Sequence, residues 1–308
     1  MEMTNLKRTV AYMDKSKEAL IAEVRRKFEE EMRRVQGAQE HNSKEEVAKR
    51  YCAGELPLLT REETFCFDCI QCGECCRNRG DILLNPFDVF RLCRKLEMNV
   101  NDFFKKYCKL YTGENSKLPL ARIDFRPIYG LGGEVEGTRC PFLSNRNGLY
   151  FCRVHDAKPF VCFSYPLGRI QNGKEDSRYL FMDDVDCKGA RHAKQNGVQH
   201  QVEEWIGGKA KADLEDKYNR IFGQFMTEYR NWINIDRLAK YQKGESKEYW
   251  VWVQVVGDLL YGRYDSVKTE EEFLARLEEN IETIRQFSEL LVFKMRDKLN
   301  LKPKQHTA

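Results

Sequence analysis

The hydrophobic pattern at the start of the chain predicts one amphipathic helix. Between residues 12 and 36 an apolar side chain recurs at about every fourth position within a charged background, as at Leu20, Val24 and Phe28. This spacing places the apolar side chains on one face of a helix. We expect that face to pack against the rest of the protein, with a partner helix or self-association as the alternative. A polar connecting arm follows, so residues 1–64 form the first predicted segment.

Helical spacing returns after about residue 200. Apolar and aromatic residues share one face of a first helix (Ile221, Phe225, Tyr229 and Trp232) and of a later one (Phe273, Leu277, Ile281, Ile284, Leu291 and Met295). Thr269 and Glu272 form a capping-box pair that predicts where the later helix begins. The intervening YWVWVQVVGDLLYG is apolar enough to be buried but fits a helix or a strand. Residues 191–308 are therefore predicted to form a helical bundle covering the middle of the chain.

The middle segment, residues 65–190, differs from its flanks in composition. It contains most of the twelve cysteines and six of the eight prolines. Asn85 followed by Pro86 supplies an N-cap and a first helical position, which predicts a short helix over about residues 86–96. A second brief helix is expected near residue 101. Residues 111–150 are expected to form loops with short strands such as ARIDF and GLYFC.

These patterns predict an α+β fold that is mostly helical. Its centre is an irregular, cysteine-rich metal-binding domain with short helices and strands, flanked by the N-terminal helix and the C-terminal helical bundle. Composition agrees with a soluble protein, since 42% of the 308 residues are hydrophobic and 32% are charged. The net charge of +4 arises from 52 basic and 48 acidic residues, which is too weak and too mixed to indicate nucleic acid.

The expected compartment decides how the cysteines are used. No apolar run approaches the roughly 20 residues of a membrane-spanning helix, and the N-terminus lacks the pattern of a secretory signal. We therefore expect a cytoplasmic protein with no membrane partner. Reducing conditions there leave thiols free to bind metals, and disulfides are disfavoured.

The densest chemistry lies in CFDCIQCGECC, residues 66–76. Its cysteines form three overlapping C-x2-C steps: Cys66, Cys69, Cys72 and Cys75. Thiolates spaced in this way in a tight turn can bind one metal or neighbouring irons of one cluster, and Gly73 leaves the backbone free to wrap. With Cys76 as the fourth ligand the spacing also matches the ferredoxin pattern, except that Arg77 stands where proline normally follows.

Cys75 and Cys76 are adjacent, and adjacent side chains are expected to point apart. The pair therefore suggests two metal sites, or one site with a thiol in reserve. Four further candidate ligands lie downstream: Cys140, Cys152, Cys162 and Cys187. The nine thiols suffice for two four-thiolate centres, and a metal joining distant segments would close the fold.

Other polar residues have weaker claims. His155 and His192 could replace a thiolate, but they are expected to lie around or outside the centre. Cys52, Cys93 and Cys108 belong to no spacing pattern and are expected to be ordinary buried or surface side chains. Arg77 and Arg79 are expected to offset the negative charge of a bound cofactor. The chain contains none of the motifs GxGxxG, GxxxxGK[ST], HExxH and GxSxG.

The middle segment resembles the YkgJ-type cysteine-cluster family, described as CxxCxxCC zinc- or iron-chelating domain proteins. Five blocks carry the resemblance, in order: Cys69-x2-Cys72-Gly-x-Cys75-Cys76, GDILLNPFDVFRL (80–92), Cys140-Pro-Phe-Leu, Cys152 leading to Lys158-Pro159-x2-Cys162 and Tyr165-Pro166, and Cys187-x-Gly189. The chain departs from the family in having Cys66, and in Lys158 where arginine is frequent. The resemblance covers residues 65–190 and implies binding of a metal or an iron–sulfur cluster.

The leading hypothesis is an iron–sulfur protein, with a 4Fe-4S cluster as the favoured cofactor and electron transfer to a protein partner as the role. Its predicted ligands are Cys69, Cys72, Cys75, Cys76, Cys140, Cys152, Cys162 and Cys187, with Cys66 as a further candidate. The alternative is a non-catalytic zinc module for protein–protein interaction or metal handling, because zinc uses the same thiolate sites. An enzyme with one iron left open is a third possibility. The sequence leaves catalysis and the oligomeric state undecided.

Overall fold

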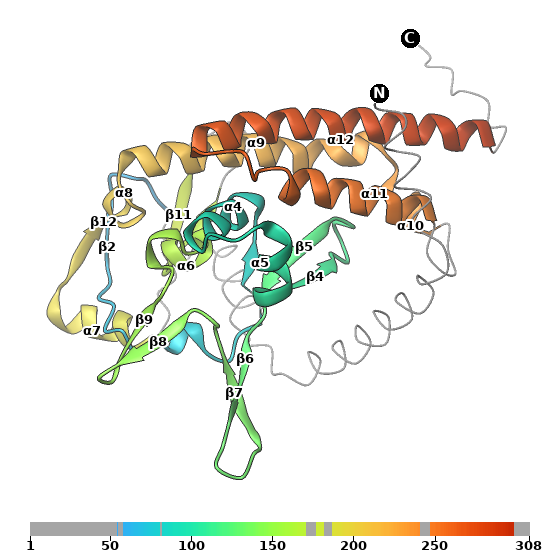
Figure 1. The fold of residues 1–308 in the computed structure, drawn as a ribbon. Coiled ribbons are helices and arrows are strands. Elements are labelled where there is room, and N and C mark those ends of the chain that lie inside the picture. Colours follow the sequence, from blue (N-terminus) through green and yellow to red (C-terminus); the bar gives the residue numbers. More distant parts are fainter. Residues whose placement is uncertain are drawn as a thin grey trace. The chain divides into compact units, whose positions relative to one another are not determined.

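The structure is a computed structural model (Figure 1). It describes residues 54, 58–80, 82–170, 177–181, 187–240 and 247–298. The chain divides into two compact units, Met1–Glu55 and Leu56–Ala308. The helix predicted over residues 12–36 lies outside the described residues, and so does Cys52. Every element below belongs to the second unit.

The strands within the described ranges form five small antiparallel sheets. The three-stranded sheets are β1 (Leu58–Leu59), β11 (Arg178–Phe181) and β10 (Leu167–Ile170), and β3 (Leu83–Leu84), β5 (Pro119–Ile123) and β4 (Cys108–Thr112). The two-stranded sheets are β2 (Thr64–Cys66) with β12 (Gln199–Gln201), β6 (Arg126–Tyr129) with β7 (Val135–Arg139), and β8 (Leu143–Arg146) with β9 (Leu149–Cys152). The strands predicted in ARIDF and GLYFC are confirmed as β5 and β9.

Within the described ranges most of the helical residues lie towards the C-terminus (Figure 1). The α-helices are α4 (Pro86–Lys95), α5 (Val100–Tyr107), α6 (Phe160–Ser164), α7 (Lys188–Asn196), α8 (Val202–Trp205), α9 (Lys209–Trp232), α10 (Ile235–Lys240), α11 (Lys247–Gly257) and α12 (Glu270–Lys298). Two 3₁₀ helices (Glu74–Cys76 and His155–Ala157) and a π-helical turn (Asp258–Gly262) complete the set. The fold is therefore α+β. None of the helices in the described ranges combines the length and apolarity that crossing a membrane requires.

The helix α4 confirms the prediction made from Asn85 and Pro86. The Asn85 side chain accepts the backbone N–H of Asp88 at 2.8 Å, and the Asp88 carboxylate accepts the N–H of Asn85 at 3.2 Å. This reciprocal pair satisfies two donors that a helix start leaves open. The next helix begins at Val100 with Asn99 as its cap, slightly ahead of the predicted start.

The ambiguous segment YWVWVQVVGDLLYG is helical, in α11 and the π-helical turn. Its buried positions in α11 are Tyr249, Trp252, Val253 and Val256, which is the spacing of one helix face. The next helix, α12, starts where the capping pair predicts, since Glu272 N–H donates to the Thr269 hydroxyl at 3.1 Å. The Glu272 carboxylate accepts from Lys268 N–H at 2.8 Å, one residue earlier than a full capping box requires.

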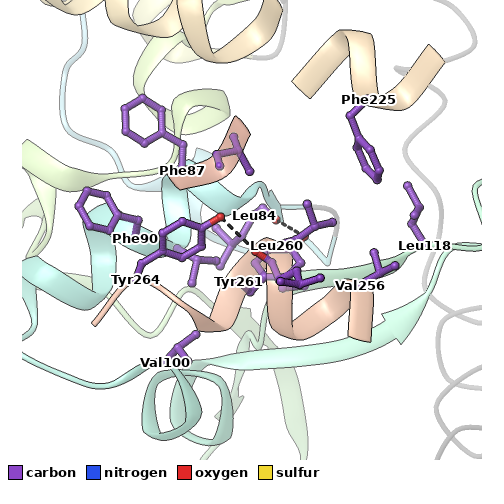
Figure 2. Packing of buried hydrophobic residues seen from close by; sticks show 14 of the residues in the cluster. Leu84, Phe87, Phe90, Val100, Leu118, Phe225, Val256, Leu260, Tyr261 and Tyr264 are labelled. Carbon is purple, nitrogen blue, oxygen red and sulfur yellow. Dashed lines mark hydrogen bonds between the residues drawn. The ribbon is translucent and has the colours of Figure 1, made fainter. Parts of the chain in front are cut away.

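One hydrophobic core joins the middle segment to the C-terminal helices (Figure 2). The ring of Phe273 on α12 lies 5.1 Å from Phe87 and 4.7 Å from Phe90, both on α4. The hydroxyl of Tyr261 donates to the carbonyl of Leu84 at 3.4 Å. Residues before and after position 190 thus bury each other's apolar surface. The three-part division of the chain stays a prediction.

Candidate metal centre

The loop that carries the first cysteines is held by backbone contacts to distant segments. Tyr150 N–H donates to the carbonyl of Gln71 at 3.1 Å, Cys140 N–H donates to Cys76 at 2.8 Å, and Asn78 N–H donates to Thr138 at 2.9 Å. These bonds fasten the loop to the hairpin β8–β9 and to the end of β7. Backbone hydrogen bonds to distant segments therefore hold the loop in position.

Gly73 gives this loop its shape. Its φ is +73°, and a Cβ at this position would lie 2.8 Å from Cγ of Tyr150. Only glycine combines this left-handed conformation with such a close approach. The turn leads directly into the 3₁₀ helix Glu74–Cys76. The sequence prediction that Gly73 lets the backbone wrap agrees with this geometry.

The adjacent thiols of Cys75 and Cys76 do not point apart. Their sulfur atoms lie 3.9 Å from each other, so the expectation of divergent side chains was wrong. That expectation suits extended backbone, in which neighbouring side chains alternate between faces. Here both residues lie in a helical turn, where neighbouring side chains can approach each other. Both sulfurs can therefore serve one centre.

Most of the predicted ligands interact electrostatically with one another. Electrostatic interactions connect seven of the nine thiols, which we call the thiol group: Cys69, Cys72, Cys75, Cys76, Cys140, Cys152 and Cys162. Cys69 and Cys75 are exposed, Cys140 is buried, and the others are partly buried. The group therefore reaches from the hydrophobic core to the surface.

The later thiols of the group come from three short elements. Cys140 follows β7, and Cys152 ends β9, where it pairs with Leu143. Cys162 lies in α6, whose first N–H, from Phe160, donates to the carboxylate of Asp88 at 2.8 Å. Asp88 also caps α4, so one buried carboxylate fixes α6 relative to α4.

The thiol group contains one thiol with a lowered pKa, that of Cys75. The hydrogen bond from the Cys76 thiol lowers the pKa of Cys75, and the cations of Arg79 and Lys158 add to this effect. The same bond raises the pKa of Cys76, because Cys76 would lose its proton to become charged. Burial raises the pKa of Cys140 to about 11, and burial followed by the Cys140 thiol raises the pKa of Cys162. Binding of a metal cation would have to displace these protons.

Two cations, Arg79 and Lys158, act on the thiol group, and Arg77 follows Cys76 directly in the sequence. Arg79 helps to lower the pKa of Cys75, and its expected role toward a cofactor stays a prediction. The guanidinium of Arg77 lies 4.4 Å from the centre of the Tyr150 ring. Lys158, which the sequence reasoning did not select, lowers the pKa of Cys75 and opposes the rise at Cys69 and Cys152. Its place four residues before Cys162 was a usable signal, but charge alone does not show which way a lysine points.

Cys66 and Cys187 lie on segments that adjoin the segment of Cys69. Cys66 ends β2, opposite Gln199 of β12, and Cys187 caps α7 beside a second apolar cluster. The bond from Asp68 N–H to the Gly189 carbonyl, at 3.3 Å, brings the segment of Cys187 alongside that of Cys69.

The remaining candidates make other contacts. Nδ1 of His192 lies 2.8 Å from the carboxylate of Asp68, and Nε2 of His155 lies 3.5 Å from Nζ of Lys158. Cys93 and Cys108 are partly buried against the hydrophobic core and influence each other electrostatically. Burial raises the pKa of both thiols to about 12. They are therefore ordinary protonated side chains, as their isolated spacing predicts.

The donors fit a thiolate-binding metal in their chemistry. Within the described ranges, however, no three His, Cys, Asp or Glu side chains are arranged to hold a metal ion. A metal bound by this group would require its side chains, above all the exposed Cys69 and Cys75, to turn inward.

The comparisons with known proteins concern this same segment. Residues 68–187 match the family model CxxCxxCC, whose description is "putative zinc- or iron-chelating domain". No curated protein and no solved structure matches the chain. The match begins after Cys66 and ends at Cys187, so it includes the whole thiol group. The similarity to this family therefore covers residues 68–187 of the chain.

Proposed function

We propose that the thiol group binds an iron–sulfur cluster of the 4Fe-4S type, and that the protein transfers electrons to a protein partner in the cytoplasm. One observation supports this proposal: seven thiols from four segments interact electrostatically with one another, and two of them are exposed. Four thiolates hold a 4Fe-4S cluster. A centre at the surface suits exchange of electrons with a partner.

The chain's own residues would do three things for such a centre. Cys75 supplies a thiolate that its lowered pKa favours, with Cys69, Cys72 and Cys76 beside it in the same loop. Lys158 and Arg79 offset the negative charge of the ligands. A bound cluster would supply a one-electron couple, whose potential depends on nearby charges and solvent exposure.

Anaerobic reconstitution tests this proposal. We expect the purified full chain to take up iron and acid-labile sulfide and to give the Mössbauer spectrum of a 4Fe-4S cluster. The variants Cys76→Ser and Cys140→Ser should lose cluster, because each removes a central thiol of the group. Cys93→Ser is the matched control, since Cys93 is partly buried but outside the group. A colourless protein with stoichiometric zinc and no sulfide would contradict the proposal.

The second candidate is a structural zinc module. The observation that favours it is the meeting of segments far apart in sequence, which a closed zinc site would tie together. In that case chelation should lower the melting temperature of the zinc-loaded chain, and redox titration should show no couple. A reversible redox couple that chelation abolishes, with no change in melting temperature, would exclude this module.

A further inference from the structure

A cavity of about 440 Å³ lies beside the thiol group. It is lined by the end of α5, by both strands of the hairpin β6–β7, by the start of β8 and by the chain after β9. Cys140 forms part of its wall, and Ser144 adds a hydroxyl. The volume falls within the range of sites for small ligands.

The charged side chains that line this cavity are all cations. They are Lys106, Arg126, Arg139 and Arg153. No carboxylate of the described residues belongs to the lining. This contrasts with the chain as a whole, in which 52 basic and 48 acidic residues are almost balanced. Positive charge is therefore concentrated in the lining, whereas the charges of the whole chain are nearly balanced.

The pairing of the strands brings arginines face to face, which destabilises the sheet unless a counter-ion is bound. Arg126 of β6 lies directly opposite Arg139 of β7, and Arg77 pairs with Arg139 on its other side. Like charges that face each other across paired strands repel and destabilise the sheet. Arg77 is partly accommodated by the Tyr150 ring. Arg126 and Arg139 both belong to the cavity.

The contacts of these side chains hold them in place but leave most of their charge uncompensated. Arg153 donates to the Pro141 carbonyl at 2.7 Å, and Arg126 donates to the carbonyl of Lys106. Among the described residues, Arg126 is the one of these four cations that pairs with a carboxylate, that of Asp124 at 3.4 Å, which also pairs with Lys109 at 3.3 Å. Within the described part of the chain Arg139 has no hydrogen bond or ion pair from its side chain.

A purely structural role accounts for one of the four cations. Lys106 lies in the last turn of α5, where a positive charge interacts favourably with the helix end. No helix end explains Arg139 or Arg153. Guanidinium groups present paired N–H donors that match the oxygens of phosphates and carboxylates. Converging arginines around a small cavity are therefore suited to an oxyanion.

We propose that this cavity binds a small ligand that carries a multivalent oxyanion, a phosphate or a polycarboxylate. Arg139 and Arg153 bind its oxygens directly, while Arg126 and Lys106 supply further positive charge. The ligand lies against Cys140, at the edge of the thiol group. Binding depends on the arginines and does not require a metal in the thiol group.

Calorimetric titration of the full chain at low salt tests the site, with inorganic phosphate and succinate as the two probes. We expect at least one to bind with one-to-one stoichiometry, and their relative affinities distinguish a phosphate ligand from a polycarboxylate. Arg139→Gln and Arg153→Gln should each weaken binding by about tenfold or more, because each removes charge-assisted hydrogen bonds. Arg139→Gln breaks no contact of the described fold, so its melting temperature without ligand should be unchanged or higher.

The matched control is Arg146→Gln, at the far end of β8 and outside the cavity. It should bind the probe as tightly as the original chain. The proposal fails if neither probe binds, or if Arg139→Gln and Arg146→Gln bind equally well. It also fails if only long anions such as polyphosphate, RNA or an acidic peptide bind, because these would report a surface patch and not a small-ligand cavity.

Discussion

Gly73 is the residue at which the cysteine loop tolerates the least change. An alanine there would need a left-handed conformation, which costs about 1–2 kcal/mol for a residue with a Cβ, and would press against the Tyr150 ring. We expect Gly73→Ala to lower both the melting temperature and the amount of metal bound per chain. Gly80→Ala in the same segment is the control, since nothing lies within 4 Å of a Cβ there. Equal metal content in the two variants would contradict this view of the loop.

Asp88 makes stability depend on pH in an unusual direction. Burial, followed by the nearby Glu215 carboxylate, raises the pKa of Asp88 from 3.8 to about 7. Between these values the folded chain binds a proton that the unfolded chain has released. Stability from this group is therefore complete below about pH 4 and is lost as pH rises through about 7.

Asp88→Asn tests this sign. The asparagine side chain cannot ionise. The unfolding free energy of the variant should therefore change less between pH 4 and 7 than that of the original chain, and the two changes should differ by up to about 4 kcal/mol. It should be less stable at low pH, because an amide oxygen cannot accept both backbone N–H groups as well as the carboxyl does. Chemical denaturation at several pH values measures the difference. Parallel pH profiles for the two chains would show that Asp88 does not titrate in this range.

At the scale of elements, local signals predicted the helices and long-range contacts decided the rest. Asn85-Pro86 and Thr269 predict helix starts because capping is a matter of a few adjacent residues. The spacing of the cysteines likewise indicates which residues belong together. The approach of Cys75 to Cys76 depends on a 3₁₀ turn whose shape Gly73 and Tyr150 set together. Such a contact joins segments that no local pattern relates.

The positions of Lys158 and of the cations around the cavity likewise could not be predicted from the sequence. The position of Lys158 near the thiols follows from the packing of α6, which Asp88 fixes from over 70 residues away. Arg126 and Arg139 become neighbours only through the register of β6 with β7. The sequence shows that these residues are charged. Only the tertiary structure shows which charges face one another.

A buried ion network joins three helices of this fold. Arg91 on α4 pairs with Glu215 on α9 and with Glu270 at the start of α12, the latter at 2.5 Å. Glu215→Ala would leave the buried Arg91 without this partner, and loss of one member of a buried pair costs about 3–5 kcal/mol. The control is Glu279→Ala in an exposed pair on α12, expected to cost less than about 1 kcal/mol. Urea denaturation gives both values, and similar losses would show that the network contributes no more than a surface pair.

At the scale of the whole molecule, the shared hydrophobic core predicts that the metal domain depends on the C-terminal helices. Phe87 and Phe90 pack on Phe273, and β2 loses its partner β12 if the chain ends at residue 190. A fragment of residues 65–190 should therefore stay poorly folded even with zinc or iron, because metal binding does not replace the missing apolar surface. Coexpression with residues 191–308 should restore the fold. The amide spectrum of each sample measures this, and a well-dispersed spectrum of the isolated fragment with metal would show that the thiol group alone is enough to organise the domain.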